Sequence, residues 1–351
     1  MEIINWIKYK YSKPYSKLIL IDDNQNWSIS WDAKELKKIF YNLGLNTVIN
    51  CSRNLPLNQS IFYLNRYEIL LDWTSSNRRI GFPYYHGRPD SGDEFSKMIH
   101  TIKNHHEQIT RIQITHSEMH EIILETGIDP QKVFKIPIGI NLDYFTLTTR
   151  QLRRNARLKL GIPQSALVIG SFQKDGNGWG EGLEPKLIKG PDIFLRTIEI
   201  LKTKFENIFI LLTGPSRGYM KKGLNQMGVP YLHRNLYDYT IIGEYYNALD
   251  LYIVSSRQEG GPKAVLESMA SGIPLVTSKV GQAMDLVKHG KNGWIVEVGD
   301  VEALFHWVTY VIEKSNSLDS VISAGRKTAE ENCYSAQTTL WKTFMNGFVD
   351  S

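Results

Sequence analysis

The chain has 351 residues, which is enough for two hydrophobic cores. Apolar residues make up 42% and charged residues 22% of it, values that indicate a globular protein and exclude a disordered or membrane-embedded one. The net charge of +5, from 41 basic and 36 acidic residues, is too small to favour nucleic-acid binding, so we expect no nucleic-acid partner.

Cysteine content and the length of the apolar runs indicate the compartment. Cys51 and Cys333 are far apart in sequence, which argues against a disulfide framework and against a cysteine-based metal site. The start of the chain has no apolar stretch as long as a signal peptide, and the longest apolar runs, such as Ile208–Leu212, are of strand length. We therefore expect a cytoplasmic protein, with the inner face of the membrane as an alternative location.

In the first half, short β-rich runs alternate with amphipathic segments of helical length, which predicts a parallel sheet covered by helices. Asp32–Leu43 and Glu94–His106 are predicted helices, and Asp32 is the predicted N-cap of the first. The predicted strands are Lys17–Asp22, Asn46–Cys51, Arg79–Tyr85, Arg111–Thr115 and Val133–Ile136.

A polar, arginine-rich segment, Leu147–Gly161, is predicted to be a linker and an entry helix, and the alternation restarts after it. The predicted strands of the second half are Leu167–Phe172, Ile208–Thr213, Tyr231–Arg234, Leu251–Ser255 and Ile273–Ser278. Its predicted helices are Pro191–Lys204, Gly218–Met227, Ile241–Leu249 and Pro262–Ala270.

This order of elements predicts an α/β fold with two Rossmann-like, doubly wound domains in series. We expect an N-terminal domain over residues 1–148 and a C-terminal domain over residues 149–334. A C-terminal helix within residues 335–351 is expected to pack back onto the first domain. Because α/β sheets bind ligands beyond the carboxyl ends of their strands, an interdomain cleft is the expected site.

The strongest motif is Ser-Ser-Arg-Gln-Glu-Gly-Gly-Pro-Lys-Ala-Val-Leu-Glu, which ends at Glu267. In the loop after a strand, Glu259 can accept hydrogen bonds from sugar hydroxyls, and Gly260 and Gly261 let a ligand approach the backbone. Pro262 is predicted at the first helical position, where the free N–H groups and the positive dipole end suit a diphosphate. Glu267 can accept both hydroxyls of a ribose, so the motif indicates a sugar nucleotide.

Two glutamates separated by seven residues around Glu-Gly-Gly-Pro resemble the signature of glycosyltransferase family 4. Further segments match that family in the same order, and the resemblance, which covers roughly Arg79 to Asp300, is specific as an ordered set. These segments are Ile136–Phe145, Ser268–Val276, Gly281–Val287 and His289–Val296.

The resemblance implies the GT-B architecture, with an N-terminal acceptor domain and a C-terminal donor domain. It implies a retaining enzyme that transfers a hexose-type sugar from a UDP- or GDP-sugar to a glycan, a lipid-linked or another hydroxyl acceptor. It also implies that no metal or other cofactor is needed, and the chain has no Asp-x-Asp motif.

The family places two basic residues against the donor phosphates. Lys189, in Lys-Gly-Pro, matches the second position, and Lys174 is assigned to the first, where the family usually has an arginine. Lys174, Lys189 and the amides near Gly260 would stabilise charge on the leaving diphosphate. The alternative for each lysine is a solvated surface charge.

Other residues are assigned by their position relative to the family pattern. His86 follows a strand where the family often has a histidine, so it is predicted to contact the transferred sugar or the acceptor; the alternative is a structural histidine. The predicted donor-binding set is completed by the loop of Gly214 and Arg217, which is otherwise an ordinary turn, by Tyr239 near the base pocket, and by Lys263 at the helix start.

Two segments depart from the family pattern. The glycine-rich loop expected after the first strand is replaced by Asp22–Asp32, which has no glycine. Asp175–Gly182 is a glycine-rich insertion, either a mobile lid or a plain connection. Residues 1–17 are rich in lysine and aromatic residues, which indicates a lysine-guarded edge strand or, as the alternative, weak peripheral contact with a membrane.

Other functions compete with this interpretation. A GT-B sugar-nucleotide epimerase or a phosphorylase would share the fold and the phosphate site without this acceptor chemistry. A non-catalytic sugar-nucleotide binding module is a third candidate. A dinucleotide dehydrogenase is excluded, because no Gly-x-Gly-x-x-Gly opens a helix after the first strand of either half.

Overall fold

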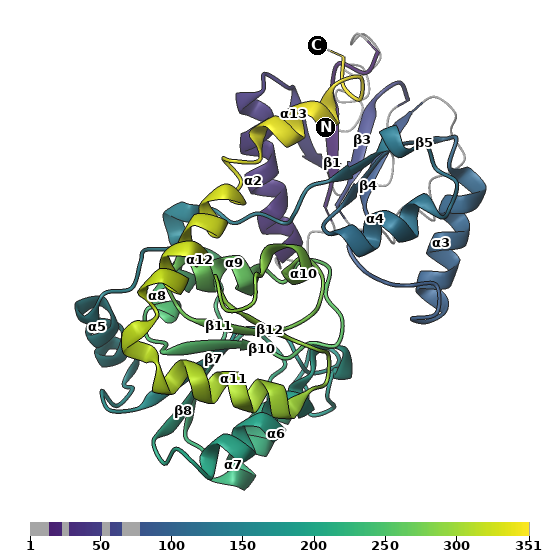
Figure 1. Cartoon of the computed structure of the whole chain (residues 1–351). Helices are drawn as coiled ribbons and strands as arrows, with labels where there is room; N and C mark the ends of the chain where they lie inside the picture. The colour runs from purple at the N-terminus through teal and green to yellow at the C-terminus, as the bar shows by residue number, and fades with distance from the viewer. Residues whose placement is uncertain (1–13, 23–27, 51–56, 65–77, 351) are drawn as a thin grey trace. The chain divides into compact units, whose positions relative to one another are not determined.

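The structure, a computed structural model, describes residues 14–22, 28–50, 57–64 and 78–350. The chain forms two compact units: unit 1 is Met1–Pro137 with Tyr334–Ser351, and unit 2 is Ile138–Cys333. In the described part of each unit, six parallel strands form one sheet flanked by helices (Figure 1). The predicted α/β fold with two Rossmann-like domains is therefore confirmed.

In the sheet of unit 1, strand β1 lies between β2 and β3. The chain passes from β1 to β2 on one side and then to β3 on the other, so its topology is doubly wound. β1 and β3 are buried at every position, because both faces of an internal parallel strand are covered. The strand order is β2 (Thr47–Asn50), β1 (Leu18–Ile21), β3 (Ser60–Tyr63), β4 (Arg79–Pro83), β5 (Ile109–Ile114) and β6 (Val133–Lys135).

Two details of unit 1 differ from the sequence prediction, one at a helix start and one in the sheet. The helices in the described part of this unit are α2 (Ser28–Asn42), α3 (Asp93–His105) and α4 (Ser117–Leu124), together with the C-terminal α13 (Thr338–Met345). Asp32 is not an N-cap, because α2 begins a turn earlier and the Asp32 carboxylate instead accepts a hydrogen bond from the Tyr334 hydroxyl. The strand β3 is absent from the prediction, since a four-residue strand followed by Leu64 offers little periodicity to detect.

The C-terminal segment, expected to pack back onto the N-terminal domain, completes the hydrophobic core of unit 1. Trp341 on α13 is 1% exposed and meets Phe40 of α2 and Phe62 of β3 edge to face, at ring-centroid distances of 5.4 and 5.9 Å. Phe344, one turn further along α13, stacks edge to face with both Phe62 and Trp341. These aromatic contacts join the last helix of the chain to its first sheet.

Trp341→Ala is expected to destabilise unit 1 by about 3–5 kcal/mol, because it removes a buried indole and leaves a cavity among three phenylalanines. Urea unfolding followed by circular dichroism measures the loss. The neighbouring Leu340 is 44% exposed and supplies the matched control, since Leu340→Ala should change the unfolding free energy by less than about 0.5 kcal/mol. Equal losses in the two variants would contradict the packing described for α13.

Unit 2 has its topological switch between β7 and β10, which are neighbours in the sheet. From β7 the chain moves outward through β8 and β9, and then returns to the other side of β7 to add β10, β11 and β12. The strand order is β12 (Trp294–Val296), β11 (Leu275–Ser278), β10 (Leu251–Val254), β7 (Leu167–Ser171), β8 (Ile208–Thr213) and β9 (Tyr231–Arg234). The carboxyl ends of β7 and β10 therefore lie at the switch point of the sheet, which is where sheets of this topology bind ligands.

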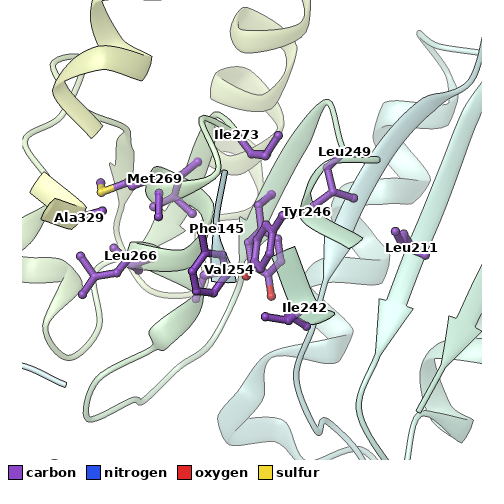
Figure 2. Close-up of a cluster of buried hydrophobic side chains, with 14 of the residues drawn as sticks. Phe145, Leu211, Ile242, Tyr246, Leu249, Val254, Leu266, Met269, Ile273 and Ala329 are labelled. Carbon is purple, nitrogen blue, oxygen red and sulfur yellow. The ribbon is translucent and has the colours of Figure 1, made fainter. Parts of the chain in front are cut away.

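The helices of unit 2 cover both faces of this sheet. They are α5 (Arg150–Leu160), α6 (Pro191–Lys202), α7 (Gly218–Met227), α8 (Ile242–Tyr246), α9 (Lys263–Ala270), α10 (Ala283–Leu286), α11 (Val301–Glu313) and α12 (Asp319–Glu331). Figure 2 shows one of the two resulting cores, in which Phe145, Tyr246 and Val254 lie together beside Leu266 and Met269 of α9. No helix in the described part of the chain is long and apolar enough to cross a membrane.

The boundary between the two units lies between Pro137 and Ile138. The sequence pattern predicts it later, at residue 148. Ile140 and Phe145 are 1% and 2% exposed in the core of unit 2. The backbone of this segment is tied to the same unit, because Thr148 N–H donates to Ser271 O and Arg326 donates to Phe145 O. The segment 138–148 therefore belongs to the second unit. The polar composition after Leu147 had indicated a linker there, but the burial of Ile140 and Phe145 places the boundary earlier.

Two helix starts in unit 2 also differ from the prediction. Pro262 is the N-cap of α9 and not its first helical residue, because its φ of −63° fits a helix but its ψ of 103° is extended. The helix predicted over Ile241–Leu249 is a 3-10 turn, Tyr239–Ile241, followed by the short α8. The basic and aromatic residues before position 14, the segment 23–27 and Cys51 lie outside the described residues.

Candidate active site

Most of the predicted site residues of unit 2 follow the carboxyl ends of its central strands. Lys174 comes just after β7, Gly214 after β8 and Glu259 after β10, and Gln282, which was not predicted, follows β11. Parallel strands present these ends at one edge of the sheet, so segments far apart in sequence meet there. The candidate site described below is this edge of unit 2.

At the centre of this edge, Lys189 and Glu259 form an ion pair with an Nζ–Oε2 distance of 2.6 Å. The other carboxylate oxygen of Glu259 accepts a hydrogen bond of 2.8 Å from the Ser256 hydroxyl. The side chains of Lys189 and Glu259 are 24% and 12% exposed, so they are held in place and still reachable. Each carboxylate oxygen retains a second lone pair, with which Glu259 can accept a ligand hydroxyl.

The backbone around Lys189 is forced into position by Gly190. Its φ is +63°, and a Cβ at this position would lie 1.9 Å from Ser255 O, so only glycine fits. The Ser255 hydroxyl donates a hydrogen bond of 2.9 Å to Gly190 O. The turn before α6 thus packs directly on the end of β10, and this packing brings Lys189 to Glu259.

The second glutamate of the motif, Glu267 on α9, is 5% exposed and accepts hydrogen bonds from two tyrosines. The Tyr239 hydroxyl donates to Oε1, and the Tyr246 hydroxyl donates to Oε2 at 2.8 Å. Burial, with the charge of Glu267 next to it, raises the pKa of Tyr246, which keeps that phenol a hydrogen-bond donor. The Lys263 ammonium lies 5.3 Å from the centroid of the Tyr239 ring, so three predicted residues meet here.

The backbone at Gly260 and Gly261 packs closely against other parts of unit 2. Gly260 O accepts a 3.0 Å hydrogen bond from the backbone of Gln282. A Cβ on Gly261 would lie 2.7 Å from the Ile138 side chain and 2.8 Å from the Gln282 amide oxygen. That amide oxygen also accepts from Ile138 N–H at 2.8 Å, so the loop is braced from behind by Gln282. The requirement for glycine at position 261 is thus structural.

Lys174 lies at the same edge, with its ammonium over an aromatic ring. Its Nζ is 3.6 Å from the centroid of the Trp179 ring, and partial burial lowers the pKa of the ammonium. The adjacent Gln173 side chain donates a 3.0 Å hydrogen bond to Lys189 O. The hydrogen bond from Gln173 therefore links the backbone segments that carry Lys174 and Lys189, the two predicted phosphate-binding residues.

Arg217 does not act as the nucleotide contact that was predicted. Its side chain is 0% exposed, and its Nε lies 2.9 Å from the carboxylate of Asp175, which is 1% exposed. Its Nη1 donates to Ser171 O and Thr213 O, at 2.7 and 2.6 Å. Burial raises the pKa of Asp175 and lowers that of Arg217, while their mutual attraction opposes both shifts. Arg217 is therefore a structural cation that joins the ends of β7 and β8.

The same ion pair anchors the glycine-rich segment Asp175–Gly182. The Ser216 hydroxyl donates to Gly178 O and Gly180 O, at 3.1 and 3.0 Å, and Gly218 N–H donates to Glu181 O at 2.7 Å. A Cβ on Gly176 would lie 2.3 Å from Ser216 O, so its glycine permits close backbone packing. These contacts hold the segment against the turn after β8, as expected for the alternative of a plain connection, and a role as a mobile lid stays a prediction. The predicted Gly214 stands in this turn with a φ of +88°, and its carbonyl accepts from the His233 ring at 2.7 Å.

Asp175→Asn is expected to destabilise the protein by about 3 kcal/mol, because the buried guanidinium of Arg217 then lacks its countercharge. Chemical denaturation measures the loss. Combining it with Arg217→Met removes both charges and should cost less than the sum of the two single variants. As a matched control, Glu313→Gln breaks the exposed Lys204–Glu313 pair, at 2.6 Å, and should cost less than about 1 kcal/mol.

His86 belongs to unit 1 and is described apart from the cluster in unit 2. Its ring meets Phe95 of α3 edge to face, with centroids 5.4 Å apart. The following Gly87 has a φ of +106°, and a Cβ there would lie 1.9 Å from the Phe95 ring. The chain after β4 is thus closely packed on α3, and a role for His86 toward a sugar stays a prediction.

Several residues of the site were not predicted from the sequence. Ser256 and Tyr246 orient the two glutamates, Gln173 and Gln282 brace the loops that carry them, and Trp179 contacts Lys174. Ser256 and Gln173 could have been predicted from the sequence, because each lies two residues after the end of a central strand. Tyr246 and Gln282 had none, because only the packing of α8 and of the β11–α10 turn brings them to the site.

Comparison with known proteins adds family evidence for the second unit. Residues 183–328 match the sequence profile of the family described as Glycosyl transferases group 1. The capsular polysaccharide biosynthesis glycosyltransferase CapM of Staphylococcus aureus is 23% identical over 241 residues, which cover 66% of this chain and 59% of the relative. The UDP-Gal:alpha-D-GlcNAc-diphosphoundecaprenol alpha-1,3-galactosyltransferase of Escherichia coli is 26% identical over 217 residues, 58% of this chain and 51% of the relative. The chain thus spans about half the length of these curated relatives.

Solved structures show the same fold along nearly the whole chain. The HepE protein of Anabaena, in complex with UDP and glucose, superposes with a TM-score of 0.73 at 15% sequence identity, covering 94% of this chain and 99% of that one. The predicted GT-B architecture is therefore shown. By fold the chain is a GT-B protein, and residues 183–328 are similar in sequence to glycosyl transferases group 1.

Proposed function

We propose that this chain is a glycosyltransferase that moves a hexose-type sugar from a nucleoside diphosphate sugar to a hydroxyl acceptor. The observation that carries the proposal is the reachable Lys189–Glu259 ion pair at the switch point of the sheet in unit 2. It places a cation, which suits a phosphate, beside a carboxylate, which suits sugar hydroxyls. A sugar nucleotide carries both groups next to each other.

Different residues of this edge bind different parts of the donor. The two lysines contact the diphosphate, and Glu259 accepts hydrogen bonds from the sugar. Glu267 accepts the ribose hydroxyls with the lone pairs that its two tyrosine partners leave available. Tyr239 and Lys263, which lie together beside Glu267, form the side of the site nearest the nucleoside.

During transfer, the bond between the anomeric carbon and the diphosphate oxygen breaks, and negative charge develops on the leaving diphosphate. Lys189 and Lys174 stabilise that charge from fixed positions, which is where electrostatic catalysis gains most. The acceptor oxygen attacks the anomeric carbon on the face that the diphosphate leaves, and its proton passes to the departing phosphate. The anomeric configuration is then retained, with no protein nucleophile, metal or cofactor assigned to the step.

The names of similar proteins support the choice of donor and acceptor. HepE was solved with UDP and glucose, the galactosyltransferase is named for UDP-Gal and a lipid diphosphate acceptor, and CapM for capsular polysaccharide. We therefore propose a UDP-sugar as the first donor to test, with a GDP-sugar as the second. A glycan or lipid-linked saccharide at the cytoplasmic face of the membrane is the proposed acceptor.

Lys189→Met and Glu259→Gln are each expected to lower kcat/KM by about 100-fold or more, because each removes a charge that faces the donor. Release of nucleoside diphosphate in the presence of a saccharide acceptor measures the rate. The pair Lys204–Glu313, at 2.6 Å and exposed, gives the matched control, since Lys204→Met should leave the rate unchanged. Unchanged rates in the Lys189 variant would refute the proposed site.

The same assay separates the competing activities. An epimerase would convert the donor without an acceptor, and a phosphorylase would require inorganic phosphate. NMR analysis of the transferred sugar tests the stereochemistry, and inversion at the anomeric carbon would end the proposed mechanism while leaving the transferase assignment in place.

Glu267→Ala is expected to weaken binding of a nucleoside diphosphate at least about tenfold, because the ribose loses a charged acceptor. Thermal shift with UDP, GDP and ADP identifies the base, since a true ligand raises the Tm by mass action. Full binding of UDP or GDP by the Glu267 variant would show that the nucleoside lies elsewhere. Binding without turnover in the wild-type chain would instead favour a non-catalytic module.

A further inference from the structure

Trp179 is a large aromatic side chain that is 61% exposed on a segment that is otherwise tied down. The segment from Asp175 to Gly182 is held by the buried ion pair to Arg217 and by the two hydrogen bonds from Ser216. Gly178 and Gly180, whose carbonyls accept those bonds, directly flank Trp179. The backbone that carries the indole is therefore fixed, although the ring itself faces solvent.

The Trp179 ring contacts Lys174, one of the two lysines predicted to bind phosphate. The Nζ stands 3.6 Å from the ring centroid, well within the range of a cation–π contact. A lysine ammonium sits on a flexible four-carbon stem, so without a partner it would sample many positions. The contact restricts Lys174 to one side of the carboxyl end of β7.

The kind of partner matters for an anion-binding cation. Lys189 is held by the carboxylate of Glu259, so a negative charge already stands beside its ammonium before a ligand arrives. For Lys174, partial burial accounts for the lowering of the pKa, with no contribution from a carboxylate among the described residues. An aromatic face attracts a cation through its quadrupole and leaves the net charge in place. Trp179 can thus orient Lys174 without cancelling the charge that a diphosphate needs.

We propose that Trp179 is a positioning residue that holds the ammonium of Lys174, still charged, toward the diphosphate of a nucleotide ligand bound at the edge of unit 2. The inference rests on the proposed function, because it needs a nucleoside diphosphate to bind there. In this proposal the glycine-rich insertion functions to hold the Trp179 indole next to Lys174. The indole acts through Lys174 and does not itself touch the reacting atoms.

The test compares Trp179→Leu with Trp179→Phe, using UDP, or GDP if thermal shift selects it, and the matching nucleoside as probes. Leucine keeps apolar bulk but has no π face, so the Kd for the nucleoside diphosphate should rise about fivefold. Phenylalanine keeps a smaller π face and should stay within about twofold of the wild type. The Kd for the nucleoside, which carries no phosphate, should be the same in all three proteins. Isothermal titration calorimetry measures the diphosphate, and NMR titration measures the weaker nucleoside.

A double-variant cycle with Lys174→Met tests that the effect passes through the lysine. Once the ammonium is gone, Trp179→Leu should weaken diphosphate binding no further, so the two changes are not additive. Leu183, exposed at 65% and close to the same segment, gives the control, since Leu183→Ala should leave both Kd values unchanged.

Each outcome bears on one of the two claims. A wild-type chain that binds no nucleoside diphosphate overturns the proposed function and this inference together. Wild-type binding that Trp179→Leu leaves intact overturns the inference alone. Equal weakening of nucleoside and diphosphate, or additive effects of Trp179→Leu and Lys174→Met, would also overturn it, because either result means that the indole acts on folding or on another part of the ligand.

Discussion

The candidate site depends on one charge pair, Lys189 with Glu259, formed between residues 70 positions apart in the chain. The pair exists because the turn at Gly190 packs on the end of β10 with no room for a side chain. That packing in turn requires β7 and β10 to be neighbours, which the doubly wound order of the sheet provides. A polar site of this kind is thus a consequence of how the apolar sheet is wound.

Basic residues at this edge fall into two classes that burial separates. Arg217 is fully enclosed, and its guanidinium is taken up by Asp175 and by the carbonyls at the ends of β7 and β8. Lys174 and Lys189 keep part of their surface and are each steadied by one partner, a ring in one case and a carboxylate in the other. A buried charge must be paired within the protein, whereas a half-buried charge can be shared with a ligand.

Sequence periodicity predicted most strands and helices of both units, because alternating β-rich and amphipathic runs reflect which faces are buried. It failed where the decision is made by distant contacts. Asp32 was placed at a helix start, although α2 begins at Ser28 and the carboxylate meets Tyr334 from the other end of the chain. The unit boundary was placed too late, since nothing local shows that Phe145 is buried against α8 and α9.

By itself, the sequence determined the α/β class, the two Rossmann-like domains and the motif from Glu259 to Glu267, because these depend on local patterns and on the order of elements. Only the tertiary structure decided which side chains meet. Lys189 pairs with Glu259, two tyrosines donate hydrogen bonds to Glu267, and Arg217 forms a buried ion pair with Asp175. The reason is that loops at the carboxyl edge of a parallel sheet come from strands distant in the chain. Their contacts are set by packing in three dimensions, and no spacing along the sequence encodes them.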